Sequence, residues 1–351
     1  MPSCLNSSSS SPCAKRGRGR FGTSLLRRIR ISYGRERFVK RKPSDINLLL
    51  AVDKPVGCTS HDVVSRVRRA LDERRVGHAG TLDPLASGVM VVGVGQATRL
   101  LGRITLDRKA YLARIAFGSE TTTDDAEGEV ARTVEPSSEL FDEVFAKRIL
   151  SGFLGLQQQV PPAFSAISVN GVRSYKRARA GEEVVLEARP VEVYSASLIA
   201  IDQVDGCPVW TVSFEVSKGT YIRSLARDIG RAAGGAAHVS DLRRTASGSI
   251  SSGMCAPLDD LDRSMARDAA LDPLRVLGLG AFDLTDRTLE DVRCGRPIDL
   301  DCLVAHGGEA QLQEGSAAAL VHAGELRAIA VLKQGRLFMD DVFPQGIGGV
   351  K

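Results

Sequence analysis

The sequence predicts an α+β fold with a large, mainly antiparallel sheet, followed by a small C-terminal β-barrel. Between residues 45 and 250, strand patterns follow one another in adjacent runs with helical patterns between them, which is typical of this fold class. From residue 279 the pattern changes to short strands separated by glycine turns at 324 and 335. The 351 residues are 43% hydrophobic and 25% charged, as in an ordinary globular protein.

The first predicted elements surround a glycine-rich loop, "GHAGTLDPLASGV", at residues 77–89. Apolar residues at helical spacing predict a helix behind Thr59 or Ser60, either of which can serve as its N-cap. In chain order we expect a strand over 46–55 that Pro55 ends, the helix over 59–75, the loop, a strand over 89–95, a short helix over 96–104, a strand over 109–118, a turn over 121–128, a second hairpin strand over 129–133 and a helix over 137–152.

The remaining elements complete the sheet and the barrel. The helix behind Thr220 carries apolar residues at helical spacing and ends at Gly234 and Gly235. In chain order we expect a strand and turn over 161–171, a short basic helix over 173–181, a strand pair over 191–202 and 208–219 around the Asp205-Gly206 turn, the helix over 220–235 capped by Thr220, a strand over 238–250, a helical linker over 256–278, and barrel strands over 319–324, 326–332 and 336–343.

The charge is unevenly distributed along the chain. Residues 1–44 hold twelve Lys or Arg and one acid, whereas residues 45–250 have no net charge and residues 251–351 are acidic. A basic arm of this kind suits a polyanionic partner, since phosphate contacts give affinity without sequence specificity. The composition of this tail predicts disorder, and three interpretations stay open: an arm that contacts RNA, an organelle transit peptide, or an extension without a role.

Several common sites are excluded by their missing motifs. The seven cysteines form no CxxC pair, so we expect reduced thiols and neither a disulfide framework nor a zinc site. "GVGQAT" lacks the third glycine of a dinucleotide fingerprint, no P-loop is present, and the five histidines have no metal-ligand spacing. No apolar run approaches the ~20 residues of a membrane helix. Asp124 and Asp125 are expected to form a solvated turn.

Asp83 is the candidate functional carboxylate. A lone aspartate between glycines is most often a turn residue. Pro84 directly behind it restricts its backbone toward extended geometry, and the glycines of the loop permit angles that other residues resist. Such a loop can hold one side chain in a fixed place.

Arg223 is the second candidate, because it falls in the first turn of the helix over 220–235. The helix dipole disfavours a cation there, but a helix start combined with a guanidinium attracts an anion. If Asp83 is that anion, its charged form is favoured, as a carboxylate nucleophile requires. A surface ion pair is the alternative interpretation for Arg223.

These residues belong to a longer set of motifs that resembles the TruB-type pseudouridine synthases, the tRNA T-arm enzymes. The resemblance covers residues 46–250 in the order of the family. It is carried by "DKPVGCTS" (53–60), "GHAGTLDPLASGVMVVGVGQATR" (77–99), "KAYLARIAFG" (109–118) with "TTTDDAEG" behind it, "VPPAFSAISVNGVRSYKRARAG" (160–181), "EARPVEVY" (187–194), "SKGTYIRSLARDIG" (217–230) and "AHVSDLRRTASG" (237–248).

The resemblance implies a role for each matching residue. Asp83 is the catalytic carboxylate and Arg223 pairs with it, whereas Tyr111 packs on the flipped uracil. Tyr221 and Leu242 line the pocket, and His78 fills the space that the extruded nucleotide leaves. A further expectation is that Lys54, with Pro55, supports the loop, while the basic helix over 173–181 and "DLRR" contact phosphates.

The resemblance also implies the reaction and the partner. The fold is the pseudouridine synthase fold, a mixed, mainly antiparallel sheet flanked by helices, over residues 45–255, with a PUA-like RNA-binding domain over 279–345. The enzyme isomerises uridine 55 of the tRNA T arm without a cofactor or metal, and no membrane is involved. We expect a monomer in a cytoplasm, or in an organelle if the tail is a transit peptide.

Two departures and two alternatives stay open. The family commonly has an aspartate where this chain has Thr122, and the C-terminal match rests on "RLFMDDVF". A tRNA-binding or folding module without turnover, or a carboxylate-dependent hydrolase, would also use a pocket of this kind. Pure binding needs no ionised acid in the pocket, and a hydrolase needs a second acid at a recognisable position.

Overall fold

The computed structural model describes residues 43–104, 107–165, 167–169, 172–174, 177, 182, 186–308 and 312–351. The chain divides into two units, residues 1–42 and 43–351, and the description below concerns the second. The predicted basic tail up to residue 42 and most of the predicted basic helix over 173–181 lie outside the described residues. No helix in the described part is long and apolar enough to cross a bilayer.

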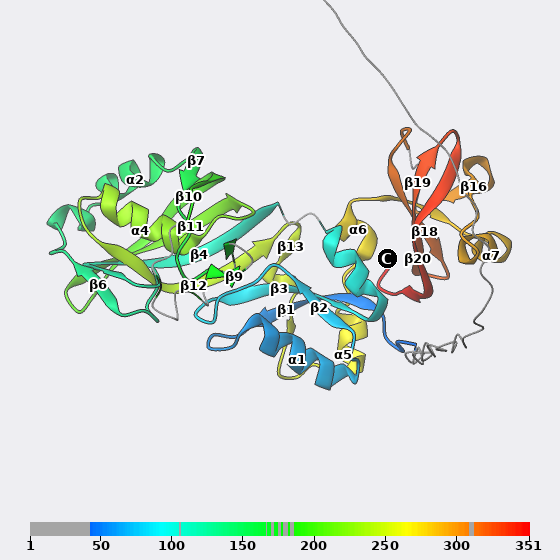
Figure 1. The fold of residues 1–351 in the computed structure, drawn as a ribbon, viewed down its shortest axis with the longest axis horizontal. Helices are drawn as coiled ribbons and strands as arrows, with labels where there is room; N and C mark the ends of the chain where they lie inside the picture. Colours follow the sequence, from blue (N-terminus) through cyan, green and yellow to red (C-terminus); the bar gives the residue numbers. More distant parts are fainter. Residues whose placement is uncertain are drawn as a thin grey trace, which may run out of the picture. The chain divides into compact units, whose positions relative to one another are not determined.

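A ten-stranded mixed sheet forms the centre of residues 43–257 (Figure 1). Its main path runs β14-β1-β3-β12-β4-β11-β10-β7, with β2 paired to β3 and β13 paired to β12. The pairs β1/β14 and β3/β12 are parallel and the others are antiparallel, which confirms the predicted mixed, mainly antiparallel sheet. The strands are β1 (Leu48–Lys54), β2 (Val76–Ala79), β3 (Ser87–Val94), β4 (Arg108–Phe117), β7 (Gly155–Gln159), β10 (Arg189–Val204), β11 (Cys207–Ser217), β12 (Ala237–Ser247), β13 (Ile250–Ser251) and β14 (Ala256–Pro257). Two small hairpins lie outside it: β5 (Ser119–Thr121) with β6 (Val130–Thr133), and β8 (Ser168–Val169) with β9 (Val172–Arg173).

Helices pack on the sheet through their apolar faces, in two separate clusters. Thr59 caps the first helix through a capping box with Asp62, which satisfies two backbone donors. Helices α1 and α5 pack on β1 and β3, whereas α2 and α4 pack on β4, β11 and β12. The helices of this region are α1 (Ser60–Leu71), η1 (Gly95–Gly102), η2 (Ser138–Phe141), α2 (Glu143–Ser151), α4 (Ile222–Ala232), η3 (Ser252–Met254), α5 (Arg263–Asp268) and α6 (Pro273–Leu277).

A six-stranded sheet follows, in the order β16-β20-β19-β18-β15-β17. Its end strands β16 and β17 do not pair with each other among the described residues, so the predicted barrel is a half-barrel. Its elements are β15 (Gly280–Asp283), α7 (Asp286–Arg293), β16 (Ile298–Asp299), η4 (Leu300–Cys302), β17 (Val304–Ala305), β18 (Ala317–His322), β19 (Glu325–Lys333) and β20 (Arg336–Ile347).

Strand β1 connects the two sheets through a shared core. Side chains alternate between the two faces of a strand, and Leu48, Leu50 and Val52 pack under α1 and α5. Leu49 and Ala51 face the opposite way and pack with residues of β18, β19 and β20. The half-barrel is therefore part of the support of the ten-stranded sheet, and the domain boundaries at 255 and 278 stay predictions.

Five local features differ from what the sequence predicted. Strand β2 was predicted as loop, and β7 was not predicted. The helix over 137–152 is divided into η2 and α2, where Asp142 caps the second piece through its side chain. The hairpin partner of β6 is β5 rather than β4. Helix α4 is capped by Tyr221, not Thr220, and no side-chain hydrogen bond contributes to this cap.

Candidate active site

Asp83 lies in the connection between β2 and β3, which α1 holds from one side. Ser60, the first residue of α1, donates from Oγ to the Leu82 carbonyl at 3.1 Å and accepts from the Leu82 N–H at 3.0 Å. The Ala86 N–H closes a turn by donating to the Asp83 carbonyl at 3.1 Å. The backbone on both sides of Asp83 is therefore fixed, as expected from the loop sequence.

Lys54 supports the same loop from the end of β1. Its side chain is fully buried, and its ammonium donates to the carbonyls of Pro55 at 2.9 Å, Pro84 at 3.3 Å and Ala86 at 2.5 Å. Burial lowers the pKa of Lys54 from its ordinary value. This geometry agrees with the predicted supporting role.

Arg244 holds the loop from β12. It is 0% exposed, and its guanidinium donates to the carbonyls of Val89 at 2.7 Å, Gly80 at 3.2 Å and Thr81 at 3.3 Å. Three bonds from one planar group fix both its own position and the start of the loop.

The prediction that "DLRR" contacts phosphates is wrong for Arg244, because this side chain is fully buried. Arg243 is partly exposed, but it forms a two-pronged ion pair with Asp53, at 3.0 Å and 2.6 Å. A pairing of this kind already uses the guanidinium edge that would meet a phosphate.

Arg223 meets Asp83 inside the protein. Its Nε lies 2.9 Å from Asp83 Oδ2, while its Nη1 lies 3.3 Å from Asp125 Oδ2. Nη1 also donates to the Thr123 carbonyl at 2.8 Å, and Nη2 to the Phe164 carbonyl at 3.0 Å. Among the described residues Nε has no aligned acceptor, so its contact with Asp83 is an ion pair rather than a hydrogen bond. The Arg223 side chain is 5% exposed and that of Asp83 38%, so the arginine is fixed while the carboxylate faces the cavity.

Asp124 and Asp125 are buried, at 7% and 3% exposure, so the prediction of a solvated turn was wrong. Asp125 Oδ1 accepts from Thr123 Oγ1 at 2.5 Å and from the Glu127 N–H at 3.1 Å. Asp124 pairs with Arg227 at 2.8 Å, and burial raises its pKa to about 6 despite this partner. Arginines of α4 therefore bind this acidic segment from a distant part of the sequence.

All six predicted site residues line one cavity of about 930 Å³, which is in the range of ligand pockets. They come from β2, the following loop, β4, the start of α4 and β12, elements that the sheet order brings together (Figure 1). The six residues are His78, Asp83, Tyr111, Tyr221, Arg223 and Leu242. The structure places these residues together, and their individual roles stay predictions.

Aromatic and apolar side chains also line the cavity. Tyr111 on β4 pairs in register with Arg244, and Leu242 with Ala113. Burial raises the pKa of Tyr111 and of Tyr221, so both phenols are neutral near pH 7. Neutral aromatic side chains that line a cavity can hold a flat, uncharged ring.

His78 lies at another side of the cavity, on β2. Burial lowers its pKa, and the nearby His61 and Arg244 act in the same direction. The His78 ring meets that of His61 edge to face, with centroids 6.3 Å apart. The imidazole of His78 is therefore neutral near pH 7 and presents a flat face without charge.

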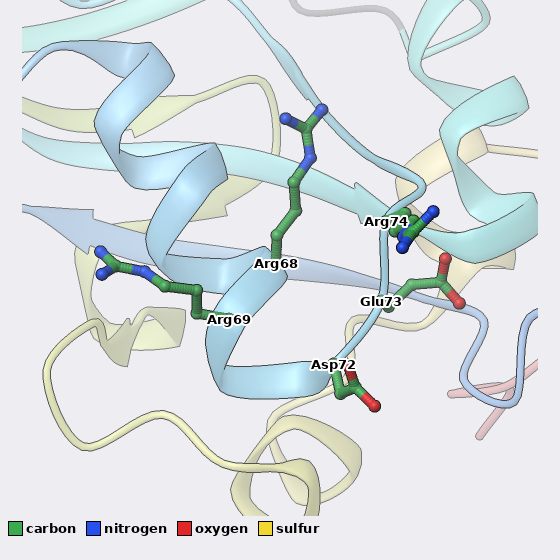
Figure 2. A pocket seen from close by; sticks show the side chains of 5 residues that line it. All are labelled: Arg68, Arg69, Asp72, Glu73 and Arg74. Carbon is green, nitrogen blue, oxygen red and sulfur yellow. The ribbon is translucent and has the colours of Figure 1, made fainter.

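A second hollow, of about 340 Å³, lies at the C-terminal end of α1. Figure 2 shows its five side chains, and Arg68 and Arg69 point in different directions. Arg68 Nη2 donates to the Val76 carbonyl at 3.0 Å, so part of this charge serves the packing of α1 on β2. The diverging side chains form no convergent site.

Three acidic or basic residues of the cavity were not predicted as site residues: Asp125, Glu127 and Lys109. Asp125 was assigned to a turn, and Lys109 was not considered although it also lines the cavity. Lys109 lies two residues before Tyr111 on a strand, and residues at this spacing share a face. That spacing was the available signal.

Comparisons with known proteins agree with this geometry. The sequence profile described as "TruB family pseudouridylate synthase (N terminal domain)" matches residues 68–222, and "tRNA pseudouridylate synthase B C-terminal domain" matches residues 223–277. A protein named tRNA pseudouridine synthase B from Mycobacterium sp. (strain KMS) is 43% identical over 287 residues, which cover 81% of this chain and 95% of that protein. A protein of the same name from Thermobifida fusca (strain YX) is 49% identical over 217 residues, which cover 61% of this chain and 73% of that protein.

Solved structures agree with the fold. A chain in the crystal structure of a Cbf5-Nop10-Gar1 complex has a TM-score of 0.59 and 25% identity, covering 85% of this chain and 85% of that chain. A chain in the structure of an H/ACA RNP bound to a substrate RNA containing 2'-deoxyuridine has a TM-score of 0.57 and 24% identity, covering 84% of both chains.

Proposed function

Because the chain belongs to the TruB family of pseudouridylate synthases, we propose that it isomerises uridine 55 of the tRNA T arm and that Asp83 is its nucleophile. The names of its relatives support tRNA as the substrate. The observation that carries the proposal is the Asp83 carboxylate, held 2.9 Å from a buried guanidinium at the wall of a cavity with two neutral tyrosines.

The reaction moves the glycosidic bond from N1 of uracil to C5. The C1′–N1 bond breaks, a C1′–C5 bond forms, and one proton leaves C5 while one is gained at N1, so the composition is unchanged. An ionised carboxylate can attack the sugar at C1′ or the base at C6, and both routes are compatible with the site. In either route the detached uracil must rotate while it is held.

The cavity walls fit these steps. A uridine within RNA must leave its stack, which costs a few kcal/mol. Stacking on Tyr111 offsets part of this, because an aromatic platform stabilises a base by about 1–3 kcal/mol. His78 faces the same cavity and has an uncharged ring with which to fill the vacated position. Arg223 keeps the carboxylate oriented, since its guanidinium is fixed by three further contacts.

The experiment maps pseudouridine in a full tRNA and in a T-arm stem-loop, with the wild type and Asp83→Asn. We expect the wild type to modify position 55 in both, and Asp83→Asn to lose at least about 1000-fold in rate while it still binds. Asp260→Asn, at an exposed aspartate, is the matched control and should retain wild-type rates.

Other outcomes lead to other functions. Equal rates for the wild type and Asp83→Asn would disprove the assignment of the nucleophile. Modification of another uridine would disprove the position. Binding without any modification by the wild type would support the alternative of a tRNA-binding module, which stays less favoured because binding alone needs no ion pair at the cavity wall.

A further inference from the structure

Lys109 lines the cavity but has no role in the proposed reaction. It lies on β4, on the same face as Tyr111, and is half-buried at the wall of the cavity. The described residues offer its ammonium no ion pair and no hydrogen bond. A long side chain that places a cation in a cavity without a partner is unfavourable unless something binds it there.

A second cation, Arg244, lies beside this ammonium. Lys109 Nζ and Arg244 Nη1 both lie within 4 Å of the point where a Cβ on Gly80 would stand, at 3.8 Å and 3.7 Å. Arg244 cannot move away, since three backbone carbonyls bind its guanidinium. Burial, and then Arg244, lower the pKa of Lys109 to about 8. Two adjacent cations create a local potential that attracts an anion.

In an RNA substrate, the anions that enter the cavity together with the uridine are its phosphodiesters. Gly80 is three residues before Asp83, so their Cα atoms are at most ~11 Å apart. Both Asp83 and Lys109 line the cavity, so a nucleotide whose base reaches Asp83 brings its flanking phosphodiesters to the same cavity as Lys109. We propose that Lys109 binds a phosphodiester oxygen of the RNA strand, at a linkage that flanks the nucleotide entering the cavity.

The chemistry of the two cations suits this task. Lysine is a compact point charge that binds a phosphate oxygen from varied directions, whereas Arg244 is already bound to three carbonyls and adds long-range attraction. The proposal rests on the proposed function, because it needs an RNA substrate in this cavity. It differs from a proton-transfer role, in which Lys109 would take the proton from C5 of uracil.

The test combines protein variants with RNA linkages. T-arm stem-loops carry a neutral methylphosphonate at one linkage at a time around the target uridine, and Kd is measured for the wild type, Lys109→Gln and Lys109→Arg. We expect one flanking linkage to weaken wild-type binding about 10- to 30-fold, the usual effect of a charge-assisted hydrogen bond. Lys109→Gln should bind natural RNA about as weakly as the wild type binds the RNA with that neutral linkage, and the neutral linkage should not weaken its binding further. The Kd of Lys109→Arg for natural RNA should stay within about threefold of wild type.

Lys333→Gln, at an exposed lysine of β19, is the matched control and should bind as wild type does. If every neutral linkage weakens the binding of Lys109→Gln as much as it weakens the binding of wild type, the proposal is overturned. A loss of turnover with unchanged Kd, which Lys109→Arg does not rescue, would assign proton transfer instead. Because the readout is binding, a wild type that binds without modifying the RNA counts against the proposed function alone.

A second measurement needs the wild type alone, should Lys109→Gln fail to fold. Lys109 carries its charge below its pKa of about 8, so Kd should rise as pH increases beyond that value. Burial lowers the pKa of His78 and raises those of the two tyrosines, so these three groups keep their neutral form across this range. His61, Asp83, Asp125, Glu127 and Arg223 also line the cavity, and the neutral linkage separates the effect of Lys109 from theirs. The rise should disappear with the neutral linkage. An equal rise with natural and neutral linkages would contradict the proposal.

Discussion

Replacing Arg223 by lysine should remove turnover and leave RNA affinity almost unchanged. The guanidinium contacts Asp83, Asp125 and the carbonyls of Thr123 and Phe164, from a side chain that is 5% exposed. An ammonium cannot occupy the positions of three nitrogens in one plane. Each buried group left without its partner costs about 1–3 kcal/mol. The free energy that holds the Asp83 carboxylate in its reactive orientation should therefore fall by about 2–4 kcal/mol.

This loss corresponds to a fall in kcat of roughly 30- to 1000-fold, since about 1.4 kcal/mol is tenfold in rate. Kd for the T-arm RNA should change less than about threefold, because the buried guanidinium offers the RNA little surface. Single-turnover rates and filter binding measure the two quantities. Arg227→Lys, one turn further along α4 and paired with Asp124 outside the cavity, is the matched control and should keep its rate within about threefold. Equal losses of rate and affinity in Arg223→Lys would refute this reasoning.

Three further predictions concern the fold and the tail. Gly88→Ala should prevent folding to a stable protein, because φ is +105° and the added Cβ would stand 2.1 Å from the Arg244 carbonyl oxygen; a wild-type melting temperature would contradict this. The pKa of Asp124 is raised from 3.8 to about 6, so the folded state holds the proton more tightly and stability falls as pH rises between these values. Measured by urea unfolding at each pH, Asp124→Asn should gain up to about 3 kcal/mol relative to wild type from pH 4 to 6.5; a constant difference would contradict the shift. Removal of residues 1–44 should weaken RNA binding and flatten its salt dependence if the tail contacts phosphates, and an unchanged slope would favour the other two interpretations.

The meeting of Asp83 and Arg223 could be predicted because each lies in a locally constrained place. A proline fixes the backbone behind the aspartate, and the first turn of a helix fixes the arginine. Their approach depends on the sheet order, which brings β3 beside β12 and β12 beside β4. The hydrophobic pattern of each segment does not predict which strands lie side by side. That arrangement was predicted only through the resemblance to a known family.

Three of the errors share one physical cause, which is contact between distant residues. The segment around Asp125 is polar enough for a solvated turn, but Arg223 reaches it from α4 and buries it. Arg244 belongs to an exposed-looking pair of arginines, yet Gly88 leaves room for the β12 backbone and the side chain turns inward. Strand β2 has four residues and becomes a strand through its pairing with β3. The monomeric state and the compartment stay predictions.

The proposed function requires that the Asp83 carboxylate touches an extruded uridine. A crystal structure of the chain with a T-arm RNA that carries a non-reacting analogue at position 55 measures this contact directly. We expect the base outside its stack, on Tyr111, with an Asp83 oxygen within ~3.5 Å of C1′ or C6. A uridine still stacked in its loop, or an Asp83 side chain turned away from it toward solvent, would show that Asp83 is not the nucleophile.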